Sequence, residues 1–99
     1  MTIDELRAVT SADELPGEHL KALWHQQQGH WDTAHGIVQK LDDEHAEWIH
    51  ALLHREEGDY GNAKYWYARC GHPWPGEIPY DAEVSTILAE LPAQHEGSG

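Results

Sequence analysis

Apolar residues recur at helical spacing along most of the chain, and no stretch alternates with a period of two for long enough to form a strand. The clearest stripe has members at i, i+3, i+6, i+7 and i+10. It consists of Trp31, Ala34, Ile37, Val38 and Leu41. The pattern predicts helices over residues 17–28, 31–41, 43–57, 60–70 and 82–91. We therefore expect a single all-α domain over 1–92, which begins with a short helical turn, and a disordered polar tail over 93–99.

The predicted helix ends rest on residues with known end preferences. Gly29 and Gly58 each follow a helix, where glycine is common because it adopts positive φ without strain. Aspartates are expected to cap the starts of the later helices. They are Asp42 or Asp43, Asp59 and Asp81. The segment 71–76 contains two prolines and two glycines, so it predicts a rigid connector without helix.

The middle of the chain contains an internal duplication. When residues 18–41 are laid over 47–70 without a gap, six positions are identical. They are the pairs Glu18/Glu47, Ala22/Ala51, Leu23/Leu52, His25/His54, Gly29/Gly58 and Ala34/Ala63. Each unit is a helix, a glycine turn and a second helix, and the shared alanines let the two helices cross closely. The duplication predicts two tandem helix-turn-helix hairpins.

The second unit resembles a known repeat. The phrase Gly58-Asp59-Tyr60-x-x-Ala63-x-x-x-Tyr67, followed by Pro75, is similar to the second half of a tetratricopeptide repeat, and Ala51 matches the small residue of its first helix. The likeness covers residues 18–75. The offset of 29 residues is shorter than the family's period of about 34. The family's large apolar residues are replaced by Glu47, His50 and His54. The run 54–71 is also similar to uncharacterised small bacterial proteins, a resemblance that implies no function.

The tetratricopeptide resemblance implies binding of a protein or peptide on a concave helical surface. We expect a groove lined by Trp48 and Leu52, together with an outward stripe of Asn62, Tyr65 and Arg69, since Tyr and Arg are enriched at binding hot spots. Two repeats are few for a stable solenoid. The terminal helices are then expected to act as caps, or the chain forms a homodimer.

Charge narrows the class of partner. Six basic residues stand against eighteen acidic ones, which gives a formal net charge of −12. This balance disfavours nucleic acids and anionic membranes, because both require clustered Lys and Arg, and it favours a basic partner or a cation. No segment has the pattern of a membrane span or a secretion signal, so we expect a cytoplasmic protein.

Nine histidines make the chain unusual, and two of them fall into a stripe on one predicted helix. Glu47, His50, His54 and Glu57 are spaced i, i+3, i+7 and i+10, so their side chains share one face. Two histidines one turn apart can bind a single zinc or nickel ion, and carboxylates can complete the shell. Two other interpretations of this stripe remain open. It can be a polar face exposed to solvent, or its histidines can pack between the two hairpins.

Three functions are therefore predicted. A non-enzymatic protein-interaction module is the first, and a divalent-metal-binding protein that uses the His/Glu stripe is the second. A small enzyme with His54 and Glu57 as an acid–base pair is the third. The segment His50-Ala-Leu-Leu-His54 lacks the glutamate of the His-Glu-x-x-His metalloprotease motif, and the chain has no phosphate-binding loop or nucleophile triad.

Overall fold

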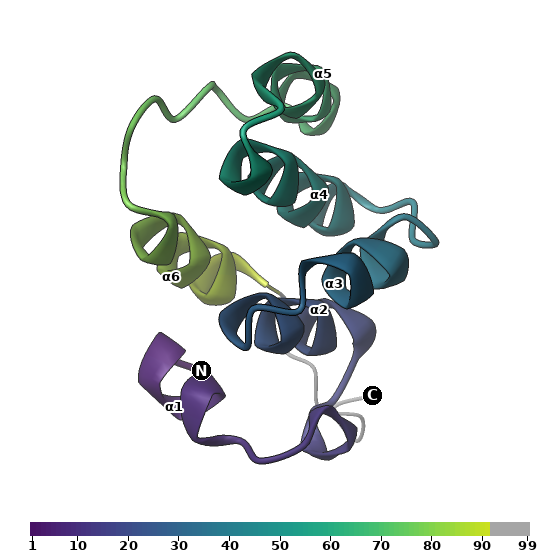
Figure 1. Cartoon of the computed structure of the whole chain (residues 1–99), viewed down its shortest axis with the longest axis vertical. Coiled ribbons are helices and arrows are strands. Elements are labelled where there is room, and N and C mark those ends of the chain that lie inside the picture. The colour runs from purple at the N-terminus through teal and green to yellow at the C-terminus, as the bar shows by residue number, and fades with distance from the viewer. Residues whose placement is uncertain (92–99) are drawn as a thin grey trace.

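A computed structural model describes residues 1–91 and contains six α-helices, one short 3-10 turn and, within those residues, no strand (Figure 1). The elements are α1 (Ile3–Ala8), η1 (Ala12–Glu14), α2 (Glu18–Gln27), α3 (Trp31–Val38), α4 (Glu44–Glu57), α5 (Tyr60–Cys70) and α6 (Tyr80–Glu90). The predicted all-α class is confirmed. The tetratricopeptide-like tandem arrangement stays a prediction, and the predicted tail over 93–99 lies outside the described residues.

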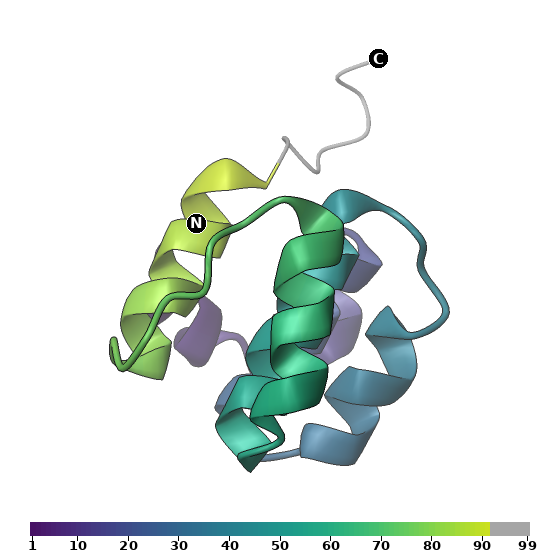
Figure 2. The ribbon, with the colours of Figure 1, turned by 90° about the horizontal axis from the view of Figure 1, so that it is seen from above.

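Helix α4 is the centre of the arrangement. It packs against α5, α3, α2 and α6, while α2 packs against α3 and α1 contacts both α2 and α6. Figures 1 and 2 show α3 and α6 on opposite sides of α4. The site described below therefore forms on one side of α4, and the connector between α5 and α6 runs over the other.

Most helix ends lie close to their predicted positions. Asp43 accepts hydrogen bonds from the backbone N–H groups of the first turn of α4, and Asp59 does the same for α5. Gly58 ends α4 at φ 88°, a left-handed conformation in which a side chain would be strained. The prediction that Asp81 is the N-cap of the last helix was wrong, because α6 begins at Tyr80 and its N-cap is Pro79. The fixed φ of proline suits a helix start.

Helix α3 is shorter than predicted. It ends at Val38, whereas the apolar stripe predicted helix to Leu41. The N–H groups of Lys40 and Leu41 donate to the carbonyls three residues earlier, so the chain tightens into a 3-10-like turn. Leu41 still packs against the core from this turn, which explains why its apolar character suggested a longer helix.

The core is formed by aliphatic side chains of the other α-helices, by Tyr67 and Cys70 of α5, and by four alanines of the internal duplication. Ala22, Ala34, Ala51 and Ala63 are all fully buried. Their small side chains allow the backbones of α2 and α3, and of α4 and α5, to approach closely. Leu52 is also fully buried. A partner cannot reach it, so the prediction that Leu52 lines a binding groove was wrong.

A buried polar network attaches α6 to α4 and α5. Arg55 of α4 donates from Nε and Nη2 to Glu83 Oε1, at 3.2 and 2.8 Å. The other carboxylate oxygen, Oε2, accepts from the Tyr67 hydroxyl at 2.6 Å and from the Trp48 indole at 3.1 Å. Burial and the Glu83 carboxylate both raise the pKa of Tyr67, which therefore stays a donor. All four side chains are buried, so every bond of the network lies out of water.

The connector is fixed to the same network. Arg55 Nη1 donates to the carbonyl oxygens of Gly76 and Ile78, at 3.3 and 3.1 Å. Trp74 lies edge-on against Tyr67, with ring centroids 5.6 Å apart, so it packs the connector against α5. None of the helices in residues 1–91 is long and apolar enough to cross a bilayer.

Candidate metal centre

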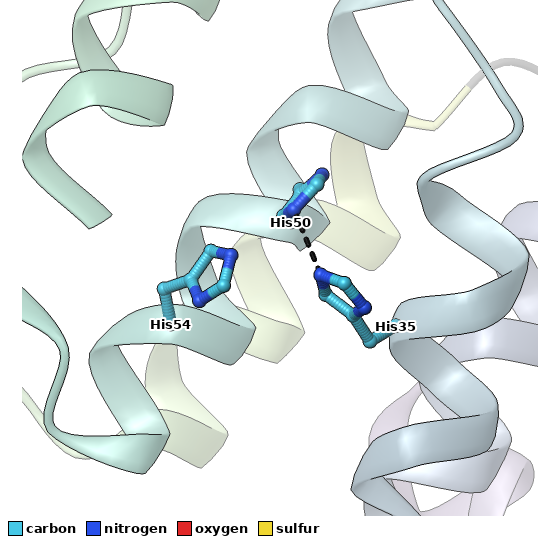
Figure 3. Close-up of side chains that lie close together, drawn as sticks. All are labelled: His35, His50 and His54. Atoms are coloured by element: carbon cyan, nitrogen blue, oxygen red, sulfur yellow. Dashed lines mark hydrogen bonds between the residues drawn. The ribbon is translucent and has the colours of Figure 1, made fainter. Parts of the chain in front are cut away.

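Three histidines from two helices meet where α3 crosses α4 (Figure 3). His50 and His54 are one turn apart on α4, and His35 of α3 faces them. The Nε2 atoms of His35 and His50 are 3.1 Å apart. One ligand nitrogen from each of the three rings lies within 4.8 Å of the others. The three imidazoles thus converge on one small volume.

Aromatic stacking fixes the planes of two of these rings. Trp31 lies one turn before His35 on α3, and the two rings stack at 4.8 Å with an interplanar angle of 9°. Trp66 of α5 stacks on His50 at 4.0 Å and 15°. Each tryptophan packs against the core, and the indole of Trp31 also donates to the carbonyl of Leu53 at 2.7 Å. The stacked rings therefore have a defined orientation before any ligand binds.

A carboxylate orients the third ring. Glu57 Oε2 is 2.7 Å from Nδ1 of His54, three residues earlier on α4. Such a bond selects the tautomer with its proton on Nδ1 and leaves Nε2 with a free lone pair. His-carboxylate pairs of this kind are the usual outer support of a metal-bound imidazole. His54 therefore has one nitrogen held by Glu57 and the other left to coordinate an ion.

Two of the three histidines, His35 and His50, favour their neutral form. Burial, together with the neighbouring His35 and His54, lowers the pKa of His50 to about 4. Burial also lowers the pKa of His35, with His54 adding to the effect. Neutral imidazole is the form that coordinates metals, because protonation occupies the lone pair. At neutral pH His50 is therefore already uncharged, as a metal ligand has to be.

His50 should make stability depend on pH. Because its pKa is about 4 in the folded chain and near 6.5 in the unfolded chain, the unfolded state binds more protons between these values. The stabilisation is complete above pH 6.5 and is lost as pH falls toward 4. In the metal-free chain the free energy of unfolding should fall by about 2 kcal/mol more between pH 7.5 and 5 than in His50→Asn. Urea unfolding at both pH values measures this difference, and equal losses in the two proteins would contradict it.

The structure brings together only part of the predicted His/Glu stripe. His50 and His54 do converge, but they are buried instead of forming a solvated face. Glu47 was wrongly predicted as a ligand: its Oε2 accepts from Arg69 Nε at 2.8 Å, and it belongs to neither group of ligand atoms found in the described residues. Glu57 contacts His54, and with Asp59 the two form a second group within 4.8 Å.

The acid–base pair predicted for an enzyme is also formed, since His54 and Glu57 share the 2.7 Å bond. Neither residue lines the cavity beside Trp48 or the cavity beside Trp74, so neither of these two cavities offers a substrate pocket next to this pair. A catalytic role for the pair stays a prediction.

The residues predicted to bind a partner are divided between the core and the surface. The Trp48 ring is buried and stacked on His72 at 3.7 Å, next to a cavity of about 160 Å³ beneath the connector. Trp48 lines this cavity together with His72, Ile78 and Glu83, and its part in binding a partner stays a prediction. Asn62, Tyr65 and Arg69 form the exposed stripe that was expected on α5. Within it Arg69 donates to the Tyr65 hydroxyl at 3.1 Å. Partner binding by this stripe stays a prediction.

Comparison with known proteins gives no relative from which a function could be transferred, because no family model, curated protein or solved structure matches this chain.

Proposed function

We propose that this chain binds one divalent transition-metal ion, zinc or nickel, through His35, His50 and His54. The observation that carries the proposal is the convergence of three imidazole nitrogens within 4.8 Å, from two helices. Imidazole is a preferred ligand of both ions. Three histidines are also a known ligand set for zinc, with the fourth position left to water or another ligand.

The distances support this assignment. Zinc–nitrogen bonds of about 2.0–2.1 Å at tetrahedral angles place two ligand nitrogens about 3.3 Å apart. The 3.1 Å between the Nε2 atoms of His35 and His50 is already close to that value. The third nitrogen would have to move inward by roughly 1.5 Å at most, which a small rotation of the His54 ring can supply.

The electrostatic surroundings also favour a cation. The chain carries a formal net charge of −12, and Glu57 would support His54 from outside the metal shell. Asp32 and Glu57 both act on His35 as nearby negative charges. Because His35 lies on α3 and the other two ligands on α4, one ion would join these helices and stabilise their packing.

A competition titration against a chromophoric zinc chelator tests the proposal. The chain is expected to bind one zinc ion, and His35→Ala should weaken binding by more than the roughly 10–100-fold that loss of an outer-shell partner costs. Glu57→Gln should fall within that range, because it removes the support of His54 and leaves the ligands in place.

The matched control is His30→Ala. His25 and His30 form another close pair, with their Nδ1 atoms 3.2 Å apart, but belong to neither group of converging ligand atoms found in residues 1–91. His30→Ala should bind zinc as the parent does. Equal affinities for the parent and His35→Ala, or a loss in His30→Ala alone, would contradict the proposal.

A further inference from the structure

A cavity of about 430 Å³ lies on the side of the molecule where the connector meets α4, α5 and α6. Its size is within the range of roughly 300–1,000 Å³ that is usual for small-molecule sites. It is lined mainly by Arg55, Tyr60, Trp74, Glu77, Ile78 and Tyr80. None of these residues belongs to the histidine cluster, so the cavity is a separate feature of the chain.

Three aromatic rings form much of the wall of this cavity. The rings of Tyr60 and Trp74 meet at 78° with centroids 5.8 Å apart, which makes a corner, and Tyr80 contributes the third ring. Tyr60 is 53% exposed and Trp74 is 38% exposed, so these rings present aromatic surface that the fold leaves open to solvent. The faces of such rings carry partial negative charge and attract cations.

Two of these rings already attract cations from the chain itself. The guanidinium of Arg55 lies 4.5 Å from the centre of the Tyr80 ring, and the ammonium of Lys64 lies 5.1 Å from the Trp74 ring. Both distances are within the range of about 6 Å in which such contacts are attractive. The contact with Lys64, which is not among the residues that line the cavity, shows that the Trp74 ring can hold an ammonium group.

The charges at the cavity argue against an anionic ligand. Arg55 is a cation in the wall, but it is buried, and its donors are engaged by Glu83 and by two backbone carbonyls. It therefore has little capacity to bind an anion. Glu77 contributes an exposed carboxylate to the lining. The net charge of −12 adds an attraction for cations at longer range.

We propose that this cavity binds an organic ammonium ion, either a quaternary ammonium or the alkylammonium of a basic side chain. The apolar groups of such a ligand would contact Tyr60 and Trp74, and its charge would face Glu77. Aromatic walls with a nearby carboxylate are the usual recognition chemistry for this class of ligand.

The test uses choline and its neutral isostere 3,3-dimethylbutan-1-ol, added to the metal-free chain while the indole N–H signal of Trp74 is followed by NMR. Choline is expected to shift this signal with a dissociation constant of about 1–10 mM, and the neutral alcohol should bind at least about 10-fold more weakly. Equal binding of the two compounds, or no shift with choline, would overturn the proposal.

Variants separate the contributions. Glu77→Gln should weaken choline binding about threefold or more. Lys64→Gln should strengthen it by a similar factor, because it removes a positive charge that lies 5.1 Å from the Trp74 ring. Tyr65→Leu, outside the cavity, should leave the affinity unchanged. Stronger binding by Glu77→Gln, or weaker binding by Lys64→Gln, would contradict a cation site.

Two further measurements identify the source of the ammonium and separate this site from the metal centre. A peptide containing trimethyllysine that binds more tightly than choline would assign a basic segment as the ligand, and weaker binding would assign a free amine. His50→Ala should bind choline as the parent does, so the two proposals can fail independently.

Discussion

Replacing Glu83 with alanine is expected to lower the free energy of unfolding by about 3–5 kcal/mol. The carboxylate accepts two hydrogen bonds from Arg55 and one each from Tyr67 and Trp48. Its removal leaves a guanidinium buried without a counter-charge and two further donors without their acceptor. Breaking one partner of a buried ion pair is costly because the desolvation of the other is no longer compensated.

Urea unfolding followed by circular dichroism measures this loss. Glu90→Ala is the matched control, because Glu90 lies on the same helix but is exposed, and its substitution should change stability by no more than about 0.5 kcal/mol. Replacing both members of the ion pair, as in Arg55→Met with Glu83→Leu, should be milder than Glu83→Ala alone. A loss below about 1 kcal/mol in Glu83→Ala would show that the network does not hold α6 in place.

Zinc is expected to stabilise the folded chain by about 4 kcal/mol when free zinc exceeds the dissociation constant about 1,000-fold. The reason is linkage: the three histidines converge only in the folded state, because His35 belongs to a different helix from His50 and His54. An ion that binds this arrangement and not the unfolded chain shifts the folding equilibrium toward the native state.

The measurement is urea unfolding at pH 7.5 with buffered free zinc and with a chelator. The His35→Ala/His50→Ala variant should lose most of the gain, whereas His30→Ala should keep it. An equal stabilisation of the parent and the double variant would place the bound zinc elsewhere.

Local signals explain why most of the helix ends could be predicted. Asp43, Asp59 and Gly58 act on backbone groups within one turn, so their effect is contained in a few residues of sequence. Leu41 misled the prediction because a periodic apolar residue shows that a side chain is buried, and not whether its backbone is still helical. The prediction at Asp81 was wrong because Pro79, two residues earlier, starts the helix without a side-chain cap.

Two of the three histidines of the candidate site could be predicted for the same reason. His50 and His54 share one face of one helix, which the i, i+4 spacing shows. His35 joins them only because α3 crosses α4 at that level, and the duplication gave no hint, since the residue equivalent to His35 is Lys64. The sequence did contain one signal for His35. Trp31 lies four residues before it, on the same face of α3, and as an apolar residue it marks that face as the one that packs against the rest of the protein.

Contacts between helices also account for the candidate residues that were wrong. Glu47 has the right spacing on α4, but α5 places Arg69 beside it and the two form an ion pair. Glu83 was not a candidate from the sequence, yet donors from α4 and α5 converge on it. Periodicity within one helix carries no information about which side chains the neighbouring helices supply.

The most direct test of the metal centre is the zinc K-edge X-ray absorption spectrum of the one-to-one complex. We expect a shell of four light atoms at about 2.0–2.1 Å that includes three imidazoles, and the loss of one imidazole in His35→Ala. A shell with one imidazole or none, or a spectrum that does not change in His35→Ala, would contradict the assignment of His35, His50 and His54 as the ligands.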